Sequence, residues 1–190
     1  MPKGKDKRLV YIPGDIVKEV KEISRRRGES LNLYVSEVLR LAIKANRLGY
    51  SPSEAAEFLD IMQAQRNLGG AFIPTDVLSY LNNKASDTEI EQLQKKWFES
   101  GKWHGKYLNE KFKDPIEAFK KFLEATRWDL NEVEINKTEK VVKFRCISTL
   151  LTGEGTKLLV KFIEGAMMSI GYEIEKSDAI KGMMLLEFKK

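Results

Sequence analysis

The spacing of apolar residues changes twice along the chain. Residues 7–13 alternate between apolar and polar and then reach a proline, which predicts a short strand. Residues 15–128 repeat apolar side chains at helical spacing, and from about residue 130 the period of two returns. The pattern therefore predicts an α+β protein with a strand followed by two helices, a helical middle region, and a small C-terminal sheet.

The first segment divides cleanly at its turn residues. Pro13 ends the strand because proline cannot donate to a strand ladder. A helix is expected over about 15–27, and Gly28 supplies the left-handed residue that closes it. Asn32 is expected to cap a second helix that runs to about Asn46.

The second helix carries more apolar surface than one short segment can bury. Its apolar stripe is widened on both sides, which implies burial against several neighbours. We therefore expect two copies of the segment to pair, their strands forming a two-stranded ribbon of the kind that a DNA major groove admits. The apolar positions are Leu31, Tyr34, Val35, Val38, Leu41, Ala42 and Ala45.

Residues 7–46 resemble the ribbon-helix-helix family of repressors, of the Arc and methionine-repressor type. The junction of strand and proline matches, as does the run Gly28-x-Ser30-x-Asn32 before the second helix. In that family, alternate strand residues contact bases, and the amino end of the second helix clamps a phosphate. The resemblance implies that Lys7, Leu9 and Tyr11 face the bases. It also implies that the backbone N–H groups of Ser30, Leu31 and Asn32 bind the phosphate.

The base-facing positions depart from the family pattern. Leu9 and Tyr11 stand where polar or basic residues are usual, and Arg8 stands at a position that is usually apolar. Leucine and tyrosine can contact a thymine methyl but read few donors or acceptors. Either the register differs by one residue, which turns Arg8 to the groove, or sequence discrimination is modest. Tyr11 has a further interpretation as an aromatic residue that packs within the ribbon.

Positive charge is concentrated in the same segment. Residues 1–47 hold twelve Lys and Arg against six Asp and Glu, a net of +6, whereas the whole chain carries +5. Affinity for a polyanion comes largely from counterions released by such charge. We expect Lys3 and Lys5 to contact phosphates as well. The alternative is a solvated basic arm without a partner.

Two further regions follow the DNA-binding candidate, which we place at 1–48. A helical region is expected over 52–128, with Ser86 and Glu89 forming a capping box and Asp114-Pro115 opening a further helix. Residues 129–190 are predicted to form a ββαββ domain packed with the helical region. Its strands are expected to turn at Asn136-Lys137 and again at Ser177-Asp178.

The predicted sheet has two unequal faces. One is apolar and should face the helix that begins at Thr152 or Gly153; it comprises Val142, Phe144, Cys146, Met184, Leu186 and Phe188. The other is half apolar, and we expect it to pack on the middle helices or on a second subunit.

Catalytic and metal chemistry find little support. The chain has one histidine, His104, and one cysteine, Cys146, on different segments, so we expect no metal, no cofactor and no enzyme activity. His104 is predicted to be exposed or to cap a helix, and Cys146 to be a small core residue. Residues 153–157 lack the spacing of a phosphate loop and are interpreted as the flexible beginning of a helix.

Aromatic residues and lysines alternate over 95–107. This stretch is either a second nucleic-acid surface or, as we favour, the core of a helix pair whose lysines face solvent. Its aromatic residues include Trp97, Phe98 and Trp103.

The leading hypothesis is a homodimeric regulator that binds double-stranded DNA, with a C-terminal part that oligomerises, up to a tetramer, or senses an effector. A DNA-organising or partition protein of low specificity is the first alternative, and an antitoxin-like protein-binding module is the second. The composition is that of a globular protein without a membrane span, and a lone cysteine suits a reducing cytoplasm. We therefore expect a cytoplasmic, nucleoid-associated protein.

Overall fold

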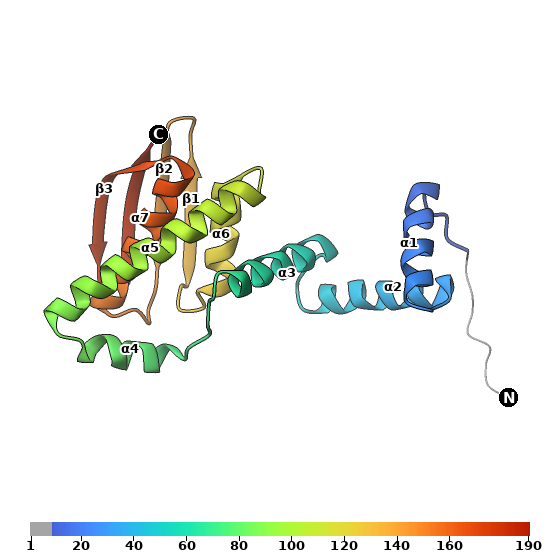
Figure 1. Cartoon of the computed structure of the whole chain (residues 1–190), viewed down its shortest axis with the longest axis horizontal. Coiled ribbons are helices and arrows are strands. Elements are labelled where there is room, and N and C mark those ends of the chain that lie inside the picture. Colours follow the sequence, from blue (N-terminus) through green and yellow to red (C-terminus); the bar gives the residue numbers. More distant parts are fainter. Residues whose placement is uncertain (1–8) are drawn as a thin grey trace. The chain divides into compact units, whose positions relative to one another are not determined.

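The computed structural model describes residues 9–190, apart from the side chain of Asp87. Within that range the chain forms seven helices, and four antiparallel strands lie in its C-terminal part (Figure 1). The α+β class predicted from the sequence is therefore confirmed. The chain divides into two compact units, Met1–Glu57 and Phe58–Lys190, and the division falls within the third helix.

The first unit contains α1 (Gly14–Arg26) and α2 (Leu31–Arg47). Pro13 precedes α1 with a non-helical backbone, and its carbonyl accepts the first helical hydrogen bond, from Val17. Gly28 has a positive φ of 70°, which lets the chain leave the helix as predicted. Two arginines in the last turn of α1 lie at the negative end of the helix dipole.

The expected cap of α2 is wrong by two residues. Ser30 is the N-cap, and its Oγ accepts a hydrogen bond from the backbone N–H of Leu33. Asn32 lies inside the first turn, where its side chain is exposed. Both residue types are good caps, but a serine placed just before the helix reaches the amide three residues later.

Residues 9–12 are not in a strand in the single chain. The predicted ribbon needs a second strand beside it, and no strand of the described chain pairs with this segment. The earlier part of the predicted strand, Lys7 and Arg8, lies outside the described residues.

The second unit begins within α3 (Pro52–Asn67) and continues with four helices. Ser86 and Glu89 form the predicted capping box of α5, and Asp114 caps α6 with Pro115 at its first position. α5 continues without a break through Gly101. The helices are α4 (Thr75–Lys84), α5 (Asp87–Lys111), α6 (Pro115–Thr126) and α7 (Gly153–Ile170).

The four strands form one antiparallel sheet in the order β1-β2-β4-β3, and the ββαββ connectivity is as predicted. Both expected turns were placed too early. β1 continues through Lys137, and the second hairpin turns at Lys181-Gly182, where Gly182 has a φ of 74°. Ser177 and Asp178 instead pair with β4, so the strand continues through the two residues at which a turn was expected. The strands are β1 (Glu132–Lys137), β2 (Val141–Ile147), β3 (Glu173–Ile180) and β4 (Met183–Lys189).

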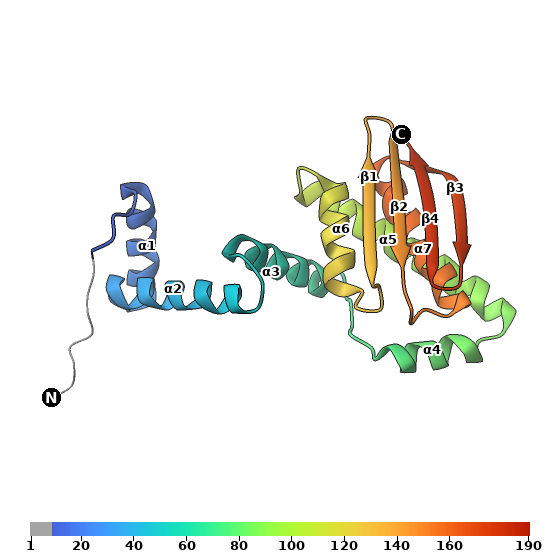
Figure 2. The same cartoon turned by 180° about the vertical axis from the view of Figure 1, so that it is seen from behind.

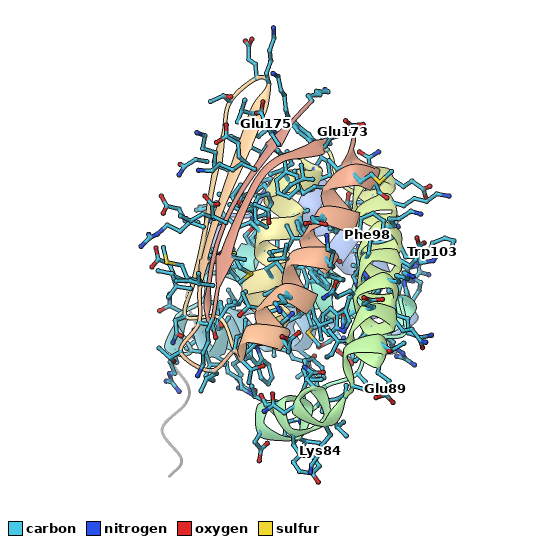
Figure 3. The ribbon with its side chains drawn as sticks, turned by 90° about the vertical axis from the view of Figure 1, so that its left-hand side faces the viewer. Lys84, Glu89, Phe98, Trp103, Glu173 and Glu175 are labelled. Carbon is cyan, nitrogen blue, oxygen red and sulfur yellow. The ribbon has the colours of Figure 1, made fainter. Side chains whose placement is uncertain are left out.

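α5, α6 and α7 lie on one face of the sheet (Figure 2). α7 and α6 lie against the strands, and α5 packs on α7 in a further layer (Figure 3). The six side chains predicted to face the helix are all buried. They share one core with Phe119, Phe122 and Leu159 from the helices.

The opposite face of the sheet is not covered by the middle helices, contrary to one of the two expectations for it. Its charged side chains pair across the strands instead. Lys143 lies 2.9 Å from Glu187, and Arg145 forms ion pairs with Glu132 and Glu134. Whether a second subunit lies on this face stays a prediction.

α5 and α7 approach so closely that glycine is required at their crossing. A Cβ atom at Gly105 would overlap the carbonyl oxygen of Ala166, and one at Gly165 would overlap that of Phe98. Because both obstacles are backbone atoms, neither can move aside without separating the helices. The sequence pattern gave no signal of this contact.

None of the helices in residues 9–190 is both long enough and apolar enough to cross a bilayer. Within the same described range, no three His, Cys, Asp or Glu residues form a group that could hold a metal ion.

Candidate nucleic-acid interface

The turn between α1 and α2 is held by Arg27. Its Nε lies 3.2 Å from a carboxylate oxygen of Glu29, and its Nη2 lies 3.5 Å from Glu37. The guanidinium also lies over the ring of Tyr34, at 5.4 Å from the ring centre. Arg27 therefore fixes the two helices together, and its charge is partly compensated within the unit. From the sequence, Arg27 is only the last residue of the first expected helix.

The amino end of α2 has the features of an anion-binding helix terminus. The first amides of any helix lack carbonyl partners within it, and here those of Leu31 and Asn32 follow the Ser30 cap. No acidic residue lies in the first turn of α2. The neighbouring carboxylate, Glu29, is engaged by Arg27. The resemblance had implied a phosphate contact at these three residues, and the geometry is compatible with one.

The described part of the first unit has almost no core of its own. In residues 9–57 of the single chain, Ser24 is the only buried residue. Its hydroxyl donates a hydrogen bond to the backbone carbonyl of Lys21. Large apolar side chains on both helices remain substantially exposed. They include Ile16, Leu33, Val38, Leu39, Leu41 and Ile43.

The basic side chains of this unit are also exposed. They lie on both helices. The exposed residues are Lys18, Lys21, Arg25, Arg26, Arg40, Lys44 and Arg47. A polyanion would therefore meet these charges directly.

The candidate base-reading residues are only partly described. Leu9 and Tyr11 are 82% and 91% exposed, whereas Ile12, from the opposite set of the alternation, is 40% exposed. Val10, which belongs to the same set as Ile12, is 71% exposed, so exposure in the single chain does not separate the two predicted faces. The remaining candidates, Lys3, Lys5, Lys7 and Arg8, lie outside the described residues.

His104 is buried, so the prediction that it is exposed or a cap is wrong. It is 6% exposed and lies edge-on to Phe122 and Phe162. Its Nδ1 donates a hydrogen bond of 2.8 Å to the carbonyl of Ser100. Burial lowers the pKa of the imidazole, outweighing that hydrogen bond, so the ring is neutral. Sequence reasoning missed this because one histidine on a helix has no pattern to place it.

Cys146 is a core residue, as predicted. It lies on the helix-facing side of β2, and burial raises the pKa of its thiol to about 12. A thiol that stays protonated is neither a nucleophile nor a metal ligand at neutral pH.

The glycine-rich stretch 153–157 is the capped beginning of α7. Thr152 is the N-cap, and its Oγ1 accepts a hydrogen bond from the amide of Gly155. The amide of Thr156 bonds to the Thr152 carbonyl. The stretch is thus a helix start, in agreement with the interpretation favoured from the sequence.

The aromatic and lysine stretch of α5 is divided between core and surface. Trp97 packs edge-on against Phe162, which agrees with the core interpretation. Trp103 departs from it, because its side chain is 63% exposed and lies on the outer side of α5 (Figure 3). The ammonium group of Lys106 lies over the Trp103 ring at 5.7 Å.

Comparison of the chain with protein-family models and with curated proteins found no match. Its function must therefore be argued from its own residues.

Proposed function

We propose that the protein is a homodimeric DNA-binding regulator of the ribbon-helix-helix type. The observation that carries the proposal is the state of the first unit. In the single chain its described apolar side chains are exposed or only partly buried, and its residues 1–47 carry the excess positive charge of the protein. A second copy accounts for the apolar surface, and a polyanion accounts for the charge.

Pairing of two copies would bury the apolar stripes of α1 and α2. Burial of one leucine, isoleucine or valine side chain contributes about 1.5–3 kcal/mol. Several such residues from each chain suffice to offset the entropy of association. The strand segments before Pro13 would then lie side by side and satisfy the backbone groups of each other.

The paired strands would enter the major groove with Leu9 and Tyr11 toward the bases. The amino end of α2 would bind a phosphate through the amides that follow Ser30. The arginines in the last turn of α1 precede this helix end by a few residues in the sequence. The phosphate contacts set affinity and orientation, and the strand side chains set sequence preference.

A second candidate is a DNA-organising protein of low specificity. It is favoured by the two apolar side chains at base-facing positions, because leucine and tyrosine discriminate weakly between base pairs. The two candidates share the interface and differ in the ratio of specific to non-specific affinity.

DNA binding of the full chain tests the proposal. We expect the affinity for a mixed-sequence duplex to fall as a power of salt concentration, with a slope of about −0.9 per phosphate contacted. Charge reversal at two exposed arginines of α1, Arg25→Glu with Arg26→Glu, should weaken binding strongly. The matched control reverses Lys181 and Lys190 in the second unit, which changes the net charge equally and should leave binding nearly unchanged.

A flat salt response, or an equal loss in the control, would exclude DNA as the partner of this surface. A comparison of the protection that the protein gives to genomic fragments and to random duplexes then separates the two candidates. A regulator protects a small set of sites at low concentration, whereas an organising protein protects all sequences alike.

A further inference from the structure

The second unit contains a cavity that the DNA-binding proposal does not use. Its volume is about 590 Å³, within the range of small-molecule sites. The walls come from the end of α3, the segment 68–74, the first residues of α4, the helices α5, α6 and α7, and residues 127–129. All of these residues belong to the same compact unit.

Aromatic rings make up much of the wall. Trp97, Phe122 and Phe162 line the interior side and are anchored in the core. Phe72 and Trp128 stack on each other, with ring centres 5.3 Å apart and planes at 20°. They remain 55% and 71% exposed, which places a flat aromatic pair at the solvent side of the cavity. Such walls favour a planar occupant, because rings stack and exclude water.

The charges in the wall compensate one another. Arg127 and Asp129 form a two-pronged ion pair, with hydrogen bonds of 2.9 and 2.6 Å. Because the guanidinium is already paired and His104 is neutral, the cavity offers no uncompensated charge to a ligand. Entry of a charged molecule would add an unpaired charge to a largely apolar site, which is unfavourable.

Hydrogen-bonding groups in the wall remain available. The bond from His104 Nδ1 to Ser100 fixes the neutral ring with its proton on Nδ1, so Nε2 is an acceptor. Gln65 Oε1 is a buried acceptor, and Arg127 Nη1 a buried donor, and neither has a hydrogen-bond partner. Two acceptors in an aromatic cavity call for an occupant with an O–H or N–H donor on its edge.

We propose that this cavity binds an uncharged, planar aromatic molecule that carries a hydroxyl or ring N–H group. The donor of the ligand bonds to His104 Nε2, and its rings lie among Trp97, Phe122 and Phe162. Phe72 and Trp128 cover it from the solvent side. The inference does not depend on DNA binding, since every residue involved lies in the second unit.

Calorimetric titration of the full chain with four probes tests the proposal. The probes are 2-naphthol, its methyl ether 2-methoxynaphthalene, naphthalene, and the anion 2-naphthoate. We expect 2-naphthol to bind about tenfold more tightly than the methyl ether, which lacks the donor. Naphthalene should bind as weakly as the ether, and 2-naphthoate should bind weakest because of its charge.

Three variants locate the site. His104→Phe keeps a ring against Phe122 and Phe162 and should abolish the preference for 2-naphthol over its methyl ether. Trp128→Ala removes an exposed ring of the cavity and should weaken 2-naphthol binding about fivefold. The matched control is Trp103→Ala, which removes a similarly exposed tryptophan that does not line the cavity (Figure 3), and this variant should bind as the parent does.

Failure of all four probes to bind would overturn the proposal, as would tightest binding of 2-naphthoate. Equal losses in the Trp128 and Trp103 variants would also overturn it. If His104→Phe does not fold, as judged by circular dichroism, the comparison of the two tryptophan variants decides the location by itself.

Discussion

The hydroxyl of Ser30 accepts a hydrogen bond of 3.3 Å from the backbone N–H of Leu33, which makes Ser30 the cap of α2. Asn32, one residue before Leu33, makes no such bond in the described chain. We therefore expect Ser30→Ala to lower the free energy of unfolding by about 0.5–2 kcal/mol. Asn32→Ala should leave stability nearly unchanged. Chemical denaturation of the two variants measures both, and a larger loss in the Asn32 variant would contradict this assignment.

The exposed apolar stripes of the first unit predict an obligate dimer. Leu41 is 60% and Val38 is 44% exposed in the single chain, although both lie on the apolar side expected to pair. Sedimentation equilibrium should give twice the mass of the chain at micromolar concentration. Val38→Glu should shift the protein toward monomer and unfold the first unit, because the introduced charge would be buried without a partner. A folded monomer of the parent protein would rule out the pairing.

The register of the ribbon predicts which side chain reads bases. With Tyr11 toward the groove, Tyr11→Ala should weaken specific binding by about 1–3 kcal/mol while affecting non-specific binding less. Arg8→Ala should then lower affinity for all sequences alike through lost charge. Competition between a bound genomic site and random duplex measures the ratio. If Arg8→Ala removes the discrimination and Tyr11→Ala leaves it intact, the register is shifted by one residue.

Burial of His104 predicts a pH dependence of stability. Its pKa is lowered in the folded state from the ordinary value of 6.5, so the unfolded chain takes up the proton first as pH falls. The contribution of His104 to stability is thus complete above pH 6.5 and is lost as pH falls toward the folded pKa. We expect His104→Phe to remove this component between about pH 7 and pH 5. If the free energy of unfolding depends on pH with the same slope in the variant and the parent over that window, the prediction is contradicted.

The crossing of α5 and α7 predicts a strict requirement for glycine. Gly105→Ala should lower stability by about 1–3 kcal/mol, because the added Cβ meets the backbone of Ala166 and not a flexible side chain. Gly153→Ala is the control, since it is also helical and a Cβ there has nothing within 4 Å. The control should be neutral or slightly stabilising. Comparison of the thermal unfolding of the two variants separates the effect of the helix crossing from the effect of alanine on helix propensity.

Local patterns determined much of the fold. The proline at position 13, the glycine at 28, the Ser86 and Glu89 pair and the Asp114-Pro115 pair each act within a few residues, so the sequence alone places the helices they bound. The alternation of Val142, Phe144 and Cys146 likewise identified the buried face of the sheet. Such signals are reliable because capping and strand alternation depend on neighbours in sequence.

Contacts between distant segments decided the rest. The end of β3 is set by its ladder with β4, which overrides the turn-forming residues Ser177 and Asp178. The burial of His104 depends on Phe122 and Phe162, which come from two other helices. Arg127 lines a cavity only because the segment from 68 to 75 folds beside it. These features arise from packing between elements, for which the period of a single helix or strand carries no information.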